Sequence, residues 1–321
     1  MAVTAPGGPA HLAELPVPRP AGGEVLVKVT AAGLNPLDTL IASGALTGML
    51  LHEYPLVLGR DAAGVVEQVG PGVDGFAPGD EVLGHVPFVA PIRAGTLAEH
   101  TVLPASSVAH LPAGLDVVTS AALPLSGAAA LVVIRAVAPR PGMVVLVNGA
   151  SGGVGSFVLQ LLRPLGVEVI ATGGPNDGAR LLALGADTVV DYTAGEVVDQ
   201  VLGLHPGGVD TLVNLHGMTL DRVPLAAVRV GGAVATTTSA PDAATLAAAG
   251  RHGGVVRAAP TTAVLDELTQ LVSSGALTVQ LEQVVPLEGT LAALALLGSG
   301  TASGKLVVTL HPSRGSDTLS S

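Results

Sequence analysis

The sequence of 321 residues contains no cysteine. Disulfide bonds and metal sites built from thiolates are therefore excluded, whereas the redox state of the compartment is left open. Tryptophan is also absent and aromatic residues make up only 2% of the chain, so valine, leucine and alanine must build the core. Charged residues are scarce at 12%, which predicts an unusually apolar surface that a partner subunit partly covers.

The chain also lacks a basic face, since its net charge is −11. This charge argues against nucleic acid and against an anionic membrane surface as partners. Two uncharged runs, Val117–Ile134 and Val144–Leu162, approach the length of a membrane span, but Pro124, Gly127 and a glycine cluster interrupt them, which favours buried strands and helices. The first residues have no basic region followed by an apolar core, so we expect no secretory signal and a cytoplasmic protein.

The most informative motif is an apolar strand, a glycine-rich turn and an apolar helix within Met143–Leu165. This order is typical of a site for a dinucleotide pyrophosphate, because the free N–H groups at the helix start face the anion. Gly152 would let the backbone approach the phosphates, and Gly155 would let the helix pack closely on the strand. The alternative is a glycine-rich turn without a ligand. Under the first interpretation the cofactor contacts come from Ser151, Gly152, Gly153 and Val154.

Short apolar runs separated by turn residues predict a compact β domain over residues 1–120. Its strands are expected at Glu24–Thr30, Gly64–Val69, Asp80–Leu83 and Ala98–Leu103. From 121 to 264 strands alternate with helices, which predicts an α/β domain with a doubly wound parallel sheet and a nucleotide at its carboxyl edge. Residues 265–321 are too few for a third domain and are expected to complete the first.

Several segments together resemble one family of enzymes. They are AAGLNPLD, PLVLGRDAAGVVEQVGPGVDGFAPGDEVLG, GTLAEHTVLPAS, the glycine turn, LGADTVVDY and SGKLVVTL, in this order. The chain is similar to the medium-chain dehydrogenase/reductase superfamily, in its zinc-free quinone oxidoreductase (zeta-crystallin-like) branch. The resemblance implies a GroES-like β domain built from both chain ends, an inserted Rossmann domain, NADPH as the cofactor and a homodimer.

The positions of the family's zinc ligands carry other residues here. Asn35 stands where zinc-dependent members have a cysteine, and Gly59-Arg60-Asp61 stands where they have Gly-His-Glu. A catalytic zinc needs three protein ligands around an open position, so we predict no metal. The nine histidines are scattered, and His85 is expected to be a structural residue.

Three positions depart from the quinone reductase pattern: Leu40 replaces a tyrosine, Ala129 a threonine, and Asp177 the lysine that pairs with the ribose 2′-phosphate. These departures leave two functions open. The first is an NADPH-dependent reduction of a quinone, enone or enoyl C=C bond conjugated to a carbonyl, in secondary metabolism for example. The second is a nucleotide-binding sensor or structural protein on the same fold without turnover.

The resemblance places Asn35 beside the nicotinamide, although its side chain could instead close its own turn before Pro36. Asp38 could bind a ligand or cap the following helix, and capping is favoured. Tyr54 or His52 could supply a proton near the active site. Hydride transfer to a conjugated acceptor, in a cleft between the domains, needs no obligatory side-chain acid, because the acceptor spreads the developing charge onto its own oxygen.

The cofactor prediction depends on the end of the second strand of the Rossmann domain. After Thr172 and Gly173 the chain offers no acid for the ribose hydroxyls of NAD, which favours NADPH. Arg180 could replace the missing lysine or be solvated, Tyr192 could contact the adenosine phosphate, and Lys305 could contact a ligand or end an exposed strand. The last strand of this sheet, within GGVVRAA, is an apolar edge at which a homodimer is expected.

Overall fold

The computed structural model of the chain describes residues 1–310 and separates them into two compact units. The first unit comprises residues 1–125, 260–273 and 281 onward, and the second comprises residues 126–259 and 274–280. The predicted boundaries lay at 120/121 and 264/265. The part of the predicted first domain at 311–321 lies outside the described residues.

Residues 274–280 were assigned to the first domain from the sequence, and the structure corrects this. Gln160 of the second unit binds the backbone of Thr278 with both ends of its carboxamide. Its Nε2 donates to Thr278 O at 3.0 Å and its Oε1 accepts Thr278 N–H at 2.8 Å. The two residues are 118 positions apart in the sequence, and these hydrogen bonds hold residues 274–280 against the second unit.

A seven-stranded, mostly antiparallel sheet forms the first unit, as the short alternating apolar runs predicted. Its path runs through β14 (Leu281–Pro286), β15 (Lys305–Thr309), β2 (Glu24–Gly33), β4 (Asp61–Val69), β5 (Glu81–His85) and β7 (Val108–His110). The seventh strand, β6 (His100–Pro104), pairs with β2, and β1 (Ala2–Val3) pairs separately with β3 (Leu56–Val57). Because β15 pairs with β2, the two ends of the described chain build one sheet.

Short helices connect and cover these strands. They are α1 (Pro36–Ala42), α2 (Val117–Ser120), α8 (Thr262–Ser273), α9 (Thr290–Ser299) and the 3-10 turns η1 (Ala105–Ser107) and η5 (Leu287–Gly289). Pro36 opens α1, where its missing N–H costs nothing. The core side chains are aliphatic, and Val29, Leu34 and Leu306 belong to one buried cluster with α1 and α9 residues.

The second unit is a six-stranded parallel sheet, as predicted. Its strand order is β10 (Thr188–Asp191), β9 (Glu168–Gly173), β8 (Val144–Asn148), β11 (Val209–Asn214), β12 (Val228–Thr236) and β13 (His252–Val255). The chain winds outward from β8 and then returns to β11, so the direction reverses between these two central strands. Ligands bind at the carboxyl ends of strands around such a reversal.

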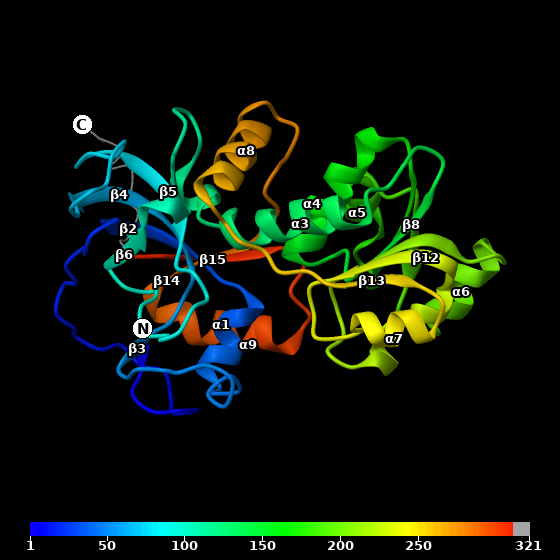
Figure 1. Cartoon of the computed structure of the whole chain (residues 1–321), viewed down its shortest axis with the longest axis horizontal. Coiled ribbons are helices and arrows are strands. Elements are labelled where there is room, and N and C mark those ends of the chain that lie inside the picture. Colours follow the sequence, from blue (N-terminus) through cyan, green and yellow to red (C-terminus); the bar gives the residue numbers. More distant parts are fainter. Residues whose placement is uncertain (311–321) are drawn as a thin grey trace, which may run out of the picture. The chain divides into compact units, whose positions relative to one another are not determined.

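Helices cover both faces of this sheet. In Figure 1, α4 (Gly153–Leu162) and α5 (Gly178–Leu184) lie on one side, and α6 (Val197–Leu204) and α7 (Ala243–Ala248) lie on the other. The unit also contains most of α3 (Pro124–Val137) and the 3-10 turns η2 (Arg163–Leu165), η3 (Leu220–Arg222) and η4 (Leu225–Ala227). No helix within residues 1–310 is long and apolar enough to cross a membrane.

Candidate functional site

The glycine turn of the second unit joins β8 to α4. Gly149 directly follows the strand and has a φ of +81°, the left-handed conformation that favours glycine. Gly152 is the N-cap of α4, so the unpaired N–H groups of the first helical turn lie at this loop. The sequence interpretation began the turn at Ala150, and the structure adds Gly149 as the residue that makes the sharp reversal.

Two glycines of the turn differ in what surrounds them. A Cβ on Gly155 would lie 2.5 Å from the carbonyl oxygens of Gly149 and Ala150, so close packing of the chain itself requires glycine there. A Cβ on Gly152 would meet only Gly149 O, at 3.7 Å, an ordinary contact. The folded chain therefore leaves room at Gly152, and a phosphate approaching the backbone would use that room.

Thr172 ties the glycine turn to the neighbouring strand. Its Oγ1 accepts Gly149 N–H at 2.8 Å and donates to Asn148 Oδ1 at 3.2 Å, and the residue is buried. The structure thus shows Thr172 supporting the turn from behind. Its predicted contact with a cofactor stays a prediction.

A polar network that the sequence interpretation missed continues across the carboxyl ends of three strands. Asn148 Nδ2 donates to Asn214 Oδ1 at 2.8 Å, and Asn214 Nδ2 donates to Thr236 Oγ1 at 3.1 Å. Both asparagines end otherwise apolar strands, which was the available signal. The network satisfies buried amides at the place where the winding of the sheet reverses, and so keeps this edge ordered.

The end of β9 lies near four residues that were predicted to contact the cofactor, Ser151, Gly173, Arg180 and Tyr192. Arg180 Nη2 donates to Ser151 O at 3.1 Å and to Asp177 Oδ1 at 2.8 Å, while its Nη1 is buried without a hydrogen-bond partner. A Cβ on Gly174, the residue after Gly173, would lie 3.3 Å from the hydroxyl of Tyr192, whose side chain is half exposed. Arg180 is therefore not simply solvated on α5.

Asp177 corrects the expectation that no acid follows the second strand of the sheet. Its Oδ2 accepts Gly174 N–H at 2.9 Å, which brings the carboxylate back to the end of β9. Three residues separate Asp177 from Gly173 in the sequence, but the turn over 174–177 closes that gap. The salt bridge with Arg180 balances the added charge.

A second polar cluster lies in the first unit, where Asn35, Asp61, Lys305 and His85 are all buried. Lys305 Nζ donates to Asn35 Oδ1 at 2.7 Å and to Leu34 O at 2.8 Å. Asn35 Nδ2 donates to Asp61 Oδ2 at 2.8 Å, and His85 Nδ1 lies 2.7 Å from Asp61 Oδ1. The sequence interpretation named Asn35 and Lys305 separately, and the structure joins them directly.

These contacts decide one expectation and add to another. Lys305 is 3% exposed and does not end an exposed strand. The Asn35 side chain bonds Asp61 and Lys305, and Asn35 and Asp38 also form a capping box at the start of α1, in which Asp38 Oδ2 accepts Asn35 N–H at 2.8 Å. His85 is buried and bonded to Asp61, and its structural role stays a prediction. Asp61 was considered only as a replaced zinc ligand, yet it is the centre of this cluster.

Burial determines the electrostatics of the cluster. Burial raises the pKa of Asp38 to about 7, although the hydrogen bond from Asn35 N–H opposes this shift and the charge of Asp61 adds to it. Burial lowers the pKa of the Lys305 ammonium, and the carboxylates of Asp61 and Asp38 oppose that shift. The cluster therefore holds an ammonium and a carboxylate that are both bonded to Asn35, and beside them the Asp38 carboxyl with its pKa raised to about 7.

Tyr54 and His52 lie on the loop before β3 and are partly buried. His52 Nδ1 bonds Leu50 O at 2.7 Å, and the two rings stack at a centroid distance of 6.4 Å. Tyr54 packs against the core cluster that contains Leu34 and Ile41. Within residues 1–310 neither ring hydrogen-bonds Asn35 or Lys305, so the proton-donor role of Tyr54 stays a prediction.

Residues 1–310 contain no group of three histidine, cysteine, aspartate or glutamate side chains that could hold a metal ion. At the expected ligand positions, Asn35 and Asp61 are instead bonded to each other, and Asn35 also accepts from the ammonium of Lys305. The residues present do not fit a catalytic zinc, which needs three ligands and an open position.

Comparison with known proteins identifies the fold family. Residues 21–113 match the alcohol dehydrogenase GroES-like domain, and residues 184–308 match the zinc-binding dehydrogenase family. The human mitochondrial NAD(P)H oxidoreductase RTN4IP1 is 32% identical to this chain, over 89% of the chain and 81% of the human protein. The chain belongs to the medium-chain dehydrogenase/reductase superfamily.

Solved structures of this superfamily agree with the assignment. A quinone oxidoreductase from Coxiella burnetii superposes with a TM-score of 0.84 at 25% identity, over 94% of this chain and 95% of that one. A mycobacterial protein solved in complex with NADPH has a TM-score of 0.82 at 30% identity, covering 96% of this chain and 98% of its own. The predicted α/β fold with GroES-like and Rossmann parts is confirmed, and the protein is an oxidoreductase of this superfamily.

Proposed function

We propose that the protein reduces, with NADPH and without zinc, a carbon–carbon double bond conjugated to a carbonyl, as in a quinone, an enone or an enoyl compound. The observation that carries this proposal is that Asn35 and Asp61, at positions where zinc-dependent members of the family have Cys and Glu, are bonded to each other, and that Asn35 also bonds the ammonium of Lys305. A neutral amide, a carboxylate and an ammonium that satisfy one another do not form a Lewis-acid site.

The choice of substrate class follows from the chemistry that such a site supports. Oxidation of a simple alcohol needs a group that stabilises an alkoxide, whereas a conjugated acceptor delocalises charge onto its own oxygen. When bound, NADPH supplies a hydride to the β-carbon of that acceptor. The protein then needs to orient the acceptor, offer hydrogen-bond donors to its oxygen and exclude competing water.

Asn35 has a positioning role in this proposal. Both ends of its carboxamide are bonded inside the first unit, so the side chain holds the β2–α1 turn and its backbone in one conformation. Tyr54 and His52 are optional donors for protonation of the enolate, and water is the other source. On this basis Asn35→Ala should lower turnover while NADPH affinity is largely kept.

The residues at the end of β9 fit NADPH better than NADH. Arg180 has a buried Nη1 without a hydrogen-bond partner, close to the glycine turn that would hold the pyrophosphate. A 2′-phosphate can accept from this donor and from the Tyr192 hydroxyl. Asp177 would repel that phosphate if it were unpaired, but Arg180 neutralises it.

A pair of variants tests the cofactor choice. Arg180→Met should weaken NADPH binding about tenfold more than NADH binding, because the phosphate contact is lost for NADPH alone, whereas loss of the contacts with Ser151 and Asp177 affects both nucleotides. Asp177→Asn should leave NADPH binding equal or tighter. Direct fluorescence titration of both nucleotides measures these effects. Equal weakening for NADH, or tighter NADH binding by the unaltered protein, would contradict the proposal.

The reaction itself is tested by stopped-flow kinetics with NADPH and with its C4-deuterated form, using 2-cyclohexenone and 1,4-benzoquinone as acceptors. We expect acceptor-dependent NADPH oxidation that slows with deuterium. Oxidation of 2-butanol with NADP without enone or quinone reduction would overturn the substrate class. Tight NADPH binding without any turnover would favour the sensor alternative, and stoichiometric zinc in elemental analysis would disprove the zinc-free assignment.

The homodimer is also part of the proposal. β13 is the last strand in the order of the second unit's sheet, so one of its edges has no neighbouring strand among residues 1–310. An edge strand of this kind pairs readily with a second copy. Light scattering at micromolar concentration should give the mass of two chains, and the mass of one chain would refute the dimer.

A further inference from the structure

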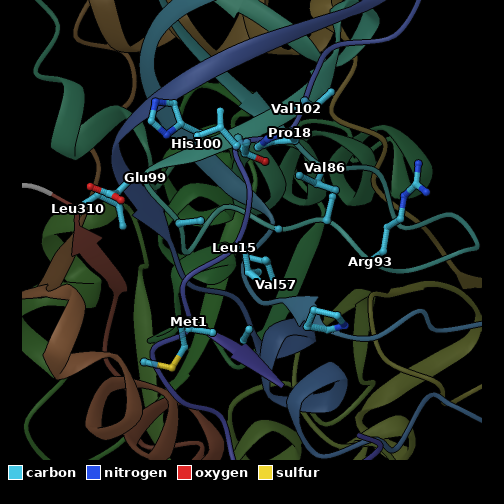
Figure 2. A pocket seen from close by; sticks show the side chains of 18 of the residues that line it. Met1, Leu15, Pro18, Val57, Val86, Arg93, Glu99, His100, Val102 and Leu310 are labelled. Carbon is cyan, nitrogen blue, oxygen red and sulfur yellow. The ribbon is translucent and has the colours of Figure 1, made fainter. Parts of the chain in front are cut away.

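A groove of about 1200 Å³ lies in the first unit, apart from the polar cluster around Asn35. The N-terminal segment 12–19 borders it, and Leu15, Val57 and Val86 are among its apolar lining residues. Figure 2 shows these three side chains in the same space, with Arg93 and Glu99 on opposite sides of the view. Neither Asn35 nor Lys305 lines it, and Arg60, which does, directly precedes Asp61 of that cluster in the chain.

Arg60 lines this groove with a side chain that is 1% exposed. One of its nitrogens, Nη1, donates to Ala94 O at 3.3 Å. The other two, Nε and Nη2, are buried and have no hydrogen-bond partner. Thr101 lines the same groove, is 2% exposed, and has a buried Oγ1 that also has no partner.

Buried donors without acceptors are rare in folded proteins, and they are most costly when the group is charged. Asp38 and Asp61 act on the Arg60 charge through space and raise its pKa, against the larger lowering by burial, but neither bonds to it. Arg60 therefore has compensating charge nearby and lacks acceptors on one edge only.

The geometry of that edge selects a ligand class. In the planar guanidinium, Nε–H and the adjacent Nη2–H point in parallel and match the two oxygens of a carboxylate. The carbonyl of Ala94 accepts from Nη1, so the edge formed by Nε and Nη2 is the one without an acceptor. Leu15, Val57 and Val86 line the same groove, and such aliphatic side chains suit a hydrocarbon body.

We propose that this groove binds an organic acid with an aliphatic chain, with its carboxylate on Nε and Nη2 of Arg60 and its chain along Leu15, Val57 and Val86. The rim does not attract anions by itself, because its acidic side chains outnumber its arginines. They are Glu14, Glu24, Glu99 and Glu288 against Arg19 and Arg93. Preference for a carboxylate thus comes from Arg60.

Isothermal titration calorimetry of the full chain with octanoate and 1-octanol tests this site. Octanoate should bind at least tenfold more tightly than the alcohol of the same chain length. Arg60→Met and Arg60→Lys should both lose this preference, since lysine keeps the charge but not the bidentate edge. Arg93→Met, which removes an arginine from the rim of the same groove, should keep it.

Further measurements separate this site from the nucleotide site. NADPH at saturation should leave octanoate affinity unchanged, and octanoate should raise the melting temperature of the unaltered protein more than octanol does. Equal affinity for acid and alcohol, unchanged octanoate binding in folded Arg60 variants, or competition with NADPH would each overturn the proposal. If neither Arg60 variant folds, the comparison of acid with alcohol in the unaltered protein and in Arg93→Met decides it.

Discussion

The two units prepare their functional residues by different means. In the second unit the glycine turn uses backbone: Gly149 makes the reversal, Gly155 allows close packing, and Gly152 leaves space. In the first unit the cluster uses buried side chains, because Lys305, Asn35 and Asp61 hold one another at 2.7–2.8 Å. The first kind of site is local in sequence, and the second depends on contacts between distant segments.

This difference has an energetic consequence. A site built from backbone, such as the glycine turn, accepts few side chains at its glycine positions, but it contains no buried charge that needs a partner. A buried ionic site tolerates no loss of a partner, because the remaining charge stays desolvated. Substitutions should therefore act through steric fit in the second unit and through charge balance in the first.

The largest effect is expected from Gly155→Val compared with Gly152→Val. At Gly155 the new Cβ would lie 2.5 Å from two backbone carbonyls, so the turn must shift and the melting temperature should fall by about 10 °C. Gly152→Val should keep the melting temperature and abolish NADPH binding. Calorimetry and nucleotide titration measure the two outcomes.

Gly203→Ala is a suitable control because nothing lies within 4 Å of a Cβ built on this glycine in α6. This substitution should leave NADPH binding unchanged. It should raise the stability only slightly, because alanine has a better helix propensity than glycine. If Gly152→Val unfolded the protein as severely as Gly155→Val, the room at Gly152 would not be available to a ligand.

The next effect concerns the buried ammonium. Lys305→Met removes the partner of Asn35 Oδ1 and the positive charge beside Asp61, so the free energy of unfolding should fall by roughly 3–5 kcal/mol. The exposed Lys28 is the other lysine of the chain, and Lys28→Met should change the free energy of unfolding by less than about 0.5 kcal/mol. Urea denaturation compares the pair, and similar losses in both variants would contradict the buried-charge account.

A smaller effect, confined to a pH window, is expected from Asp38. The folded protein binds the Asp38 proton more tightly than the unfolded chain, because its pKa is about 7 instead of 3.8. This group therefore contributes stability that is fully present below about pH 4 and is lost as the pH rises through 7, by at most about 4 kcal/mol. Above pH 7 its contribution should be constant.

Asp38→Asn should remove this slope, since the carboxamide oxygen can still accept Asn35 N–H but does not titrate. The matched control is Asp116→Asn, because Asp116 caps α2 in a similar way but is exposed. Unfolding free energies measured between pH 4 and 8 give both profiles. A slope that persists in Asp38→Asn would show that another group is responsible.

The predicted secondary structure agrees closely with the observed elements, for physical reasons that are local. Alternating apolar residues and turn residues are enough to indicate β2 or β6, and Pro36 is enough to indicate the start of α1. The domain assignment of residues 274–280 was wrong because Gln160, which holds them, lies more than a hundred positions away.

The cofactor residues show the same limit at shorter range. The sequence indicated the turn, and the family resemblance pointed to Arg180 as a replacement for the missing lysine and to Tyr192 after the third strand. It did not indicate that Asp177 would fold back onto Gly174 and pair with Arg180, since that depends on the turn over 174–177. The asparagines Asn148 and Asn214 were missed because a bond between adjacent strands needs the strand order.

The sequence by itself determined the strand–turn–helix at 143–165, the absence of thiolate chemistry, and the family to which the chain is similar. Only the tertiary structure decided that Lys305 is a buried partner of Asn35, 270 residues earlier in the chain. The physical reason is the antiparallel pairing of β15 with β2, which sets Val307 opposite Gly33 and so brings the two chain ends into one sheet. Local patterns specify strands, but strand pairing decides which buried charges meet.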